Sequence, residues 1–346
     1  MKTQQYFLRF LFSALLAVPL ALVVQADASG ADEADKPEVE KEFSIGMYKL
    51  DDDSFRFGKY SGLVDEGSEP VFDFRLQSTP DWDSSDATSW RFQGWRIGLD
   101  SMRLEFDYND QGTQRFTAGF RKIPNYRFSD GMTPFEGVGT GTLTLPDNWV
   151  GGGGTNATTD DFLVLDESLR PVHSKWDRNR LELSYDRRIG QRWKVGVDWR
   201  HETKEGMRTF GAVIGNSDGN PRAAILPSPI EWETDIMEAA FNYASPKFQF
   251  GVSLFASFFD NATPATIWEN PYGQRRGWDA GVGYPAGRGL YAHAPSNNAR
   301  HGRVYAGANL SPATRRSADF SIGSMRQDDL LFDYSVNPAL RVDIPL

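Results

Sequence analysis

The chain contains no cysteine among its 346 residues. This absence excludes disulfides, thiolate metal centres, iron–sulfur clusters and covalent c-type haem attached through a Cys-x-x-Cys-His motif. Long apolar runs are also scarce, because no segment after residue 26 approaches the roughly eighteen apolar residues of a membrane-spanning helix. If this chain spans a membrane, it must do so with strands closed into a barrel, which satisfies every backbone hydrogen bond.

Residues 1–26 are typical of a secretory signal. Lys2 and Arg9 form a basic start, an apolar stretch follows, and Ala26 ends a small-residue cleavage site. The alternative is a membrane anchor, but an apolar stretch of about fifteen residues is short for a span. We expect export and cleavage of this signal. The acidic segment at 27–42, which contains no aromatic residue, is expected to be a disordered periplasmic lead-in.

Basic charge is in deficit. Without Lys2 and Arg9 the chain carries 35 Lys and Arg against 47 Asp and Glu, a net charge of −12. An excess of acid disfavours nucleic-acid binding and a basic membrane-surface patch.

Three consecutive hairpins dominate the second half of the chain. Their residues alternate between apolar and polar with a period of two, as in a strand with one apolar face. Short turns join the strands within each pair, and about thirty to forty residues separate the pairs, an alternation typical of a transmembrane β-barrel. The expected strands are Arg180–Arg188, Arg192–Thr203, Asp235–Ala244, Phe248–Asp260, Arg303–Leu310 and Ser317–Gln327.

Six further strands are expected in the first part of the chain: Phe43–Tyr48, Ser54–Tyr60, Val71–Gln77, Trp90–Leu99, Met102–Asn109 and Thr113–Arg121. A soluble β-sandwich also alternates. Strands of about ten residues with aromatic residues near their ends favour a membrane, as does the signal. The sequence therefore predicts an all-β fold, a transmembrane antiparallel β-barrel of outer-membrane type over residues 43–346. Long loops are expected at 123–178, 204–234 and 261–302, with the last two facing outward.

The chain has four histidines, His173, His201, His293 and His301. None shows a metal-ligand spacing such as i, i+4 on a helix, so we expect exposed loop or strand histidines. No Ser–His–Asp arrangement or glycosidase-like carboxylate pair follows from spacing either. The sequence predicts no catalytic residue and no enzyme activity.

Two acidic runs, Asp51–Asp53 and Asp81–Asp86, are possible calcium loops, but both lack the glycine and distal glutamate of an EF-hand. Solvated turns are the expectation. The glycines of Gly137–Gly141 are not followed by a helical pattern, which disfavours a phosphate cradle and favours a flexible loop. No cofactor-binding or metal residue is predicted.

Charged residues on the polar strand faces are expected to point into the barrel lumen. They could contact a protein inside the barrel or select solutes. Polar-in alternation demands a wetted wall in any case, and that simpler interpretation is favoured for each residue. The residues are Glu182, Asp186, Lys194, Asp198, Arg200 and Glu238.

Five motifs resemble, in order, segments of the MtrB/PioB family of decahaem-cytochrome-associated outer-membrane proteins. Together they cover almost the whole mature chain. They are Ser54–Leu63, Thr133–Phe135 with Leu143–Trp149, Ala224–Ile230, Trp268–Tyr272 and Tyr334–Leu340.

The resemblance implies a barrel in the outer membrane of a Gram-negative bacterium. Such a barrel would sheathe and position a periplasmic multihaem c-type cytochrome, and an extracellular cytochrome could join it. Haem would be carried by the partner and not by this chain. The chain departs from the family in two respects. Some members carry a Cys-x-x-Cys near the mature N-terminus, whereas this chain has none, and the chain is expected to cover only about half of the barrel.

The number of expected strands is small for a sheath. Twelve strands about 4.8 Å apart and tilted by about 40° close at a radius of roughly 12 Å, too narrow for a folded cytochrome. We therefore expect the N-terminal part, about half, of a larger barrel. Two alternatives remain: a small solute-conducting porin that closes on its own, and a barrel enzyme such as a lipase or protease.

Overall fold

The structure is a computed structural model that describes residues 39–150, 162–217, 220–272, 288–329 and 332. The expected signal at 1–26 and the motif at Tyr334–Leu340 lie outside these residues. Most of the acidic segment 27–42 does too. Its last residues are not disordered, because they form the start of a strand. Within the described ranges no helix is both long enough and apolar enough to cross a membrane.

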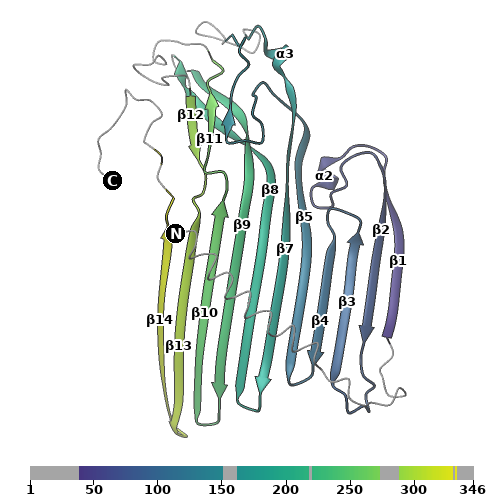
Figure 1. The fold of residues 1–346 in the computed structure, drawn as a ribbon, viewed down its shortest axis with the longest axis vertical. Coiled ribbons are helices and arrows are strands. Elements are labelled where there is room, and N and C mark those ends of the chain that lie inside the picture. The colour runs from purple at the N-terminus through teal and green to yellow at the C-terminus, as the bar shows by residue number, and fades with distance from the viewer. Residues whose placement is uncertain (1–38, 151–161, 218–219, 273–287, 330–331, 333–346) are drawn as a thin grey trace.

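In the described part of the chain, eleven strands form one antiparallel sheet in which neighbours in space are neighbours in sequence (Figure 1). The predicted all-β fold and its three C-terminal hairpins are confirmed. The strands are β1 (Val39–Leu50), β2 (Gly67–Ser78), β3 (Thr88–Ile97), β4 (Arg103–Asp110), β5 (Gln114–Thr133), β7 (Arg170–Ile189), β8 (Trp193–Ser217), β9 (Asn220–Ala244), β10 (Phe248–Asn261), β13 (Asn297–Ser311) and β14 (Thr314–Gln327).

The two ends of the sheet differ in how the strands are joined. At one end, the turn side, short turns follow β4, β7, β9 and β13. At the other end, the loop side, long connections follow β1, β5 and β10. Two short connections on the loop side are exceptions: the turn between β3 and β4, and the two residues that join β8 to β9. Short connections therefore lie at both ends of β4.

Alternation along the strands gives the sheet two chemically different faces. The apolar face carries a row of rings that crosses five strands, with neighbouring centroids 5.0–6.5 Å apart. Successive strands place these rings side by side because the register pairs apolar positions with apolar positions. The row consists of Phe43, Phe72, Phe74, Phe92, Phe106 and Phe116.

The expected strand at Ser54–Tyr60 is wrong, since Phe55–Gly58 forms the short helix α2. The Ser54 hydroxyl accepts a hydrogen bond from the Phe57 amide at 3.3 Å and caps the helix. A Cβ at Gly58 would lie 2.6 Å from the Leu63 carbonyl oxygen, so only glycine permits the tight return of the chain. Local capping and this close approach decide the conformation, although the aromatic residues alternate as in a strand.

The expected bounds of the loops at 123–178 and 204–234 are also wrong. β5 and β7 remain paired as far as Thr133 and Arg170, and β8 and β9 remain paired up to Ser217 and Asn220. β8 parts from β7 at Gly206, where φ is +139° and a Cβ would lie 2.3 Å from the Lys175 carbonyl oxygen. We call the large sheet up to this point the wall. Beyond it, β8 and β9 continue as a two-stranded extension, because their backbone pairing persists where the period-two alternation has ended.

The extension of β8 and β9 supports a second, smaller unit on the loop side, called the cap here. It contains a three-stranded sheet of β6 (Thr142–Leu143), β11 (Ala265–Glu269) and β12 (Arg288–Ala292), whereas the short helix α3 (Leu165–Ser168) precedes β7. The range 261–302 expected as loop therefore contains strands. An apolar core joins the cap to the extension. It consists of Phe135, Leu143, Ala212, Leu226 and Trp268.

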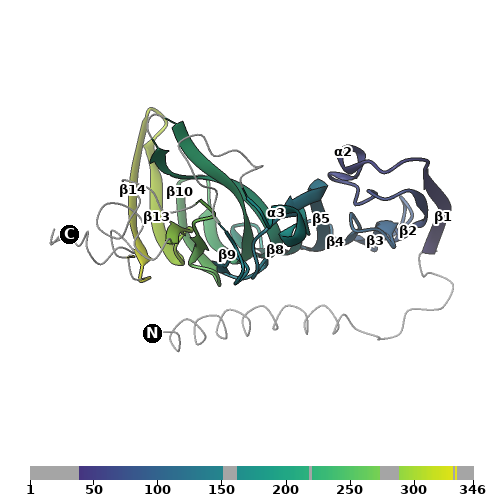
Figure 2. The same ribbon diagram turned by 90° about the horizontal axis from the view of Figure 1, so that it is seen from above.

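Seen along its strands, the sheet is bent and not flat (Figure 2). Within the described residues β1 and β14 are its two edges. Because the number of strands is odd, both edges run from the turn side to the loop side. A ladder joining β14 directly to β1 would therefore be parallel, in contrast to every other ladder of the large sheet.

Candidate functional site: the polar face of the sheet

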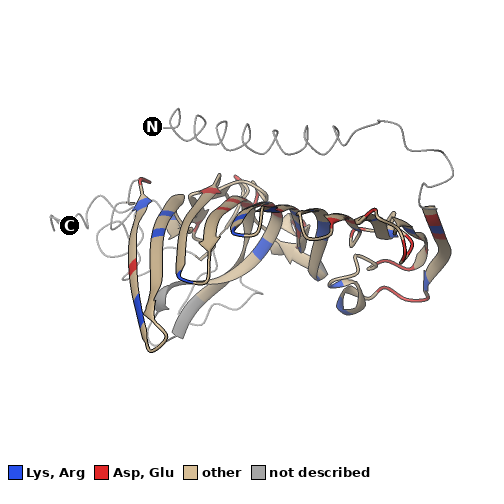
Figure 3. Ribbon diagram, turned by 90° about the horizontal axis from the view of Figure 1, so that it is seen from below, with Lys and Arg blue, Asp and Glu red and all other residues tan. Residues whose placement is uncertain are grey.

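The strand register brings the six predicted lumen residues to one face of the sheet. Glu182 of β7 is opposite Arg200 of β8. Asp198, two residues from Arg200, is opposite Glu238 of β9. Residues two apart on a strand share a face, so these side chains line one surface together with Asp186 and Lys194. We call this surface the polar face. Charges of both signs are spread over the strands that form it (Figure 3).

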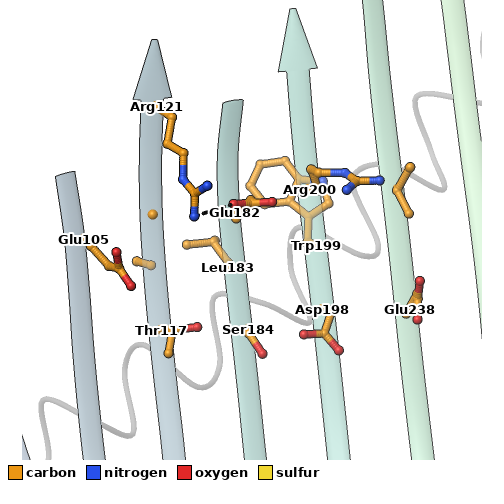
Figure 4. A pocket seen from close by; sticks show the side chains of 13 residues that line it. Glu105, Thr117, Arg121, Glu182, Leu183, Ser184, Asp198, Trp199, Arg200 and Glu238 are labelled. Carbon is orange, nitrogen blue, oxygen red and sulfur yellow. Dashed lines mark ion pairs between the residues drawn. The ribbon is translucent and has the colours of Figure 1, made fainter. Parts of the chain in front are cut away.

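Two adjoining depressions mark the polar face. The larger, of about 350 Å³, is lined from five strands, β4, β5, β7, β8 and β9. Figure 4 views this depression with the strand order of Figure 1 reversed, which means that it is seen from the opposite side of the sheet. Charged side chains that line it are Glu105, Arg121, Glu182, Asp198, Arg200 and Glu238. The smaller depression, of about 210 Å³, includes Asp186 and Lys194.

Ion pairs connect neighbouring strands across the polar face. Glu182 lies 3.8 Å from Arg121 of β5 and 3.6 Å from Arg180 of its own strand. Arg180 in turn donates to Glu202 of β8 at 2.8 Å, and Glu202 also lies 3.7 Å from Arg178. This chain of alternating charge spans three strands. Each of these five charged side chains therefore lies beside a partner of opposite charge.

Acidic groups outnumber basic ones in the larger depression. Asp198 and Glu238 are opposite each other on β8 and β9, and both are exposed. With Glu105 and Glu182 they make four carboxylates, against the two guanidinium groups of Arg121 and Arg200. The depression is therefore a negatively charged, solvated surface.

Above this depression, toward the loop side, the polar face becomes aromatic and basic. The Lys204 ammonium lies 4.3 Å from the ring centroid of Trp232 and 5.1 Å from that of Trp176. Arg208 and Arg127 approach the same two indoles, at 5.8 and 5.4 Å. Stacking of cations on indole faces stabilises both groups in a partly desolvated setting. Sequence reasoning missed this cluster because its residues come from regions expected to be loops.

The cap holds a buried polar network around His293, which corrects the expectation that all four histidines are exposed. Its Nε2 lies 3.1 Å from the Ser228 hydroxyl and 2.9 Å from the Thr266 hydroxyl. Its Nδ1 donates to the Thr263 carbonyl at 2.7 Å. Burial lowers the pKa of His293, opposed by the Thr263 hydrogen bond and assisted by the nearby Arg208 charge. The imidazole is therefore held neutral.

The distance between Ser228 and His293 is that of a catalytic pair, but the serine hydroxyl is not accessible to a substrate. The side chains of Ser228 and Thr266 are fully buried, and both hydroxyls are engaged by the same imidazole nitrogen. A nucleophile must reach a substrate carbon, so a sealed serine serves packing and hydrogen bonding instead.

The other three histidines lie elsewhere. His173 and His301 are exposed, as expected. His201 is partly buried and lies near two carboxylates of β9, with its Nδ1 3.0 Å from Asp235 and 4.0 Å from Glu233. These three residues are the one group of potential metal ligands found in the described residues. Ligand spacing along the chain could not reveal it, since the group forms across a strand pair.

The acidic runs and the glycine segment form turns. Residues 81–86 are exposed between β2 and β3, where Asp86 accepts from the Thr88 amide at 2.9 Å. Asp53 accepts from the Glu66 amide at 2.6 Å. The Thr140 hydroxyl donates to the Gly137 carbonyl at 2.7 Å and closes that turn.

Comparison with known proteins agrees with this architecture. The family described as "outer membrane beta-barrel porin, MtrB/PioB" matches residues 49–344. Outer membrane protein MtrB of Shewanella baltica (strain OS185) is 27% identical over 169 residues. That alignment covers 49% of this chain and 23% of the relative, so less than a quarter of the relative's length is matched.

Solved structures offer only a distant likeness. OmpT of Vibrio cholerae and its loop L8 deletion mutant are 10% and 11% identical, each with a TM-score of 0.31. The match covers 83% of this chain and 67% and 72% of theirs. A likeness at this level does not assign the chain to a family. The family match covers most of the sequence and agrees with the antiparallel sheet. The chain therefore belongs to the MtrB/PioB family of outer-membrane β-barrel proteins.

Proposed function

We propose that this sheet is part of an outer-membrane barrel that sheathes and positions a periplasmic multihaem c-type cytochrome for electron transfer across the membrane. The observation that carries the proposal is the polar face. Ion pairs connect its charged side chains in the order Arg121, Glu182, Arg180 and Glu202. Such a hydrated, charged surface suits a polar occupant. Haem belongs to the occupant, because a chain without cysteine has no thioether attachment site of its own.

Strand geometry supports an occupant and not an empty narrow pore. Eleven strands at about 4.8 Å spacing and a tilt of about 40° would close alone at a radius of roughly 11 Å. Closing alone would also require a parallel seam between β1 and β14. A barrel that stays antiparallel throughout needs an odd number of strands in addition to these eleven. We propose that the additional strands widen the barrel enough to admit a folded protein.

A solute-conducting porin is the second candidate. The negatively charged depression favours it, since four carboxylates against two guanidinium groups would attract small cations. An outer-membrane enzyme is not proposed. The family is porin-like, and the Ser228–His293 pair is sealed.

The orientation proposed for the barrel puts the loop side outside and the turn side in the periplasm, after export through a signal at 1–26. Short periplasmic turns and longer extracellular connections are the usual arrangement. Protease added to whole cells should cleave in the cap. Cleavage at Ser245–Lys247 in intact cells would invert the arrangement.

The deciding experiment is purification of a tagged protein, expressed from its native locus, from outer membranes. Haem absorbance and intact polypeptide mass would be recorded on the same material. A Soret band that persists through purification supports the sheath. Haem-free protein that conducts ions in planar bilayers without a partner would overturn the sheath in favour of the porin.

A further inference from the structure

His201, Glu233 and Asp235 share the apolar face of the wall, at its boundary on the loop side. Along β8 this face carries Trp193, Val195, Val197 and Trp199, and the next residue on it is His201. On β9 the same boundary places Asp235 opposite His201 and Glu233 two residues further on. The three side chains therefore gather where the apolar band ends.

We propose that His201, Glu233 and Asp235 form a binding site for a divalent transition-metal ion. One ligand atom from each residue lies within 4.8 Å of the other two. Zinc bonds of about 2.0–2.2 Å to nitrogen and oxygen place tetrahedral ligands about 3.3 Å apart. The 3.0 Å between His201 Nδ1 and Asp235 already meets this spacing, and the 4.0 Å to Glu233 requires a small movement.

The surroundings of Asp235 favour a fixed ligand. Its side chain is only 6% exposed, and Oδ1 accepts a hydrogen bond from Trp199 Nε1 at 3.1 Å. An outer hydrogen bond of this kind orients a ligating carboxylate and is a common element of metal sites. Glu233 is 43% exposed, so it can rotate toward an ion that enters from solvent. The two strands hold the nitrogen and oxygen donors on rigid elements.

The donor set indicates the class of ion. An imidazole with two carboxylates suits borderline ions such as Zn²⁺, Co²⁺ or Fe²⁺, whereas Ca²⁺ and Mg²⁺ prefer oxygen alone. Three protein ligands leave at least one coordination position for water. The metal site lies at the lipid-side boundary of the wall, so it is independent of what occupies the polar face.

Zinc titration of the full chain, folded in detergent, tests the site by calorimetry, with Co²⁺ absorbance as a second readout. His201→Ala and Glu233→Gln should each weaken Zn²⁺ binding by about tenfold or more, by comparison with known losses at metal sites. His301→Ala and Glu231→Gln are the matched controls, because both residues are exposed and lie outside the cluster. The controls should bind Zn²⁺ as the unaltered protein does.

Absence of Zn²⁺ and Co²⁺ binding by the unaltered, folded protein would overturn the site. So would equal affinity in the two cluster variants and their controls. Heat-dependent gel migration of each variant would show that the barrel wall is folded, which separates ligand loss from misfolding.

Discussion

The wall and the cap of this protein are built from strands of the same chain, yet they are stabilised in different ways. Many large apolar side chains of the wall are exposed, such as Ile45 at 83% and Ile322 at 68% on its two edge strands. Those in the core between the cap and the extension are fully buried, as in Leu143 and Leu226. A wall whose apolar face is solvated by lipid needs only its backbone ladders and alternation. The cap must carry a hydrophobic core of its own, as a water-soluble domain does.

The largest effect is expected from a cavity in the cap. Leu226→Ala removes a fully buried side chain beside Phe135, Leu143 and Trp268 and should cost about 3–5 kcal/mol of cap stability. Limited proteolysis in detergent should show faster cleavage in the cap, with the heat-dependent gel shift of the wall unchanged. Leu310→Ala is the control, because Leu310 is 66% exposed at the turn side. Equal sensitivity of both variants would remove the distinction between the two regions.

A charge on the apolar face should have the next largest effect, this time on the wall. Val197→Arg places a cation toward lipid and should cost about 2–4 kcal/mol near the bilayer midplane. Asp198→Arg, at the neighbouring position on the polar face, should insert nearly as well as the unaltered protein. The fraction folded into vesicles measures both. If the Asp198 variant were the worse of the two, the faces would be assigned the wrong way round.

Acid should destabilise the cap through His293. Because the pKa of His293 is lowered in the fold, its contribution to stability is fully present above the unfolded value of about 6.5 and is lost as the pH falls toward the folded value. Amide hydrogen exchange, corrected for intrinsic rates, should show less protection in the cap at pH 5 than at pH 7.5, values that bracket the histidine range.

Removing the imidazole tests this assignment. His293→Ala leaves the Ser228 and Thr266 hydroxyls without their shared acceptor, at a cost of about 1–3 kcal/mol, and should abolish the acid dependence. His301→Ala should retain it. Acid dependence that survives in the His293 variant would assign the effect to another group.

The smallest effect is expected from an ion pair of the wall. Arg180→Gln removes the 2.8 Å contact to Glu202, but Arg178 remains 3.7 Å from that carboxylate. The loss should be below about 1 kcal/mol. A double-mutant cycle with Glu202→Gln, followed by urea unfolding in detergent, measures the coupling. A coupling of several kcal/mol would mean that the polar face, and not the ladders, stabilises the wall.

The wall could be predicted from the sequence, because lipid imposes alternation on every crossing strand. The expected Phe248–Asp260 differs from the observed β10, Phe248–Asn261, by one residue. All six residues predicted to face the lumen lie on one face of the sheet for the same reason. Where a local hydrogen bond decided the structure, as at Ser54, alternation misled.

The cap and the metal-ligand cluster could not be predicted, because both depend on the pairing of β8 with β9. The turn of that hairpin lies between Ser217 and Asn220, within a range expected to be loop. Without the position of that turn, nothing in the sequence pairs His201 with Asp235. His293 is likewise buried by segments that meet only when β11 and β12 pack against the extension.

The unequal lengths of the strands give the rim of the barrel an uneven height. β8 and β9 each contain 25 residues, whereas β4 contains 8. At about 3.3 Å per residue, their contour lengths are roughly 80 Å and 26 Å. The described part of the loop side is therefore tall at the cap and lower at β3 and β4, where the segment that contains α2 covers the β3–β4 turn: the Lys59 carbonyl accepts a hydrogen bond from the Tyr126 amide at 3.2 Å (Figure 1). On the proposed function, a partner that docks from the loop side would meet a lower edge of the sheet at β3 and β4 than at the cap.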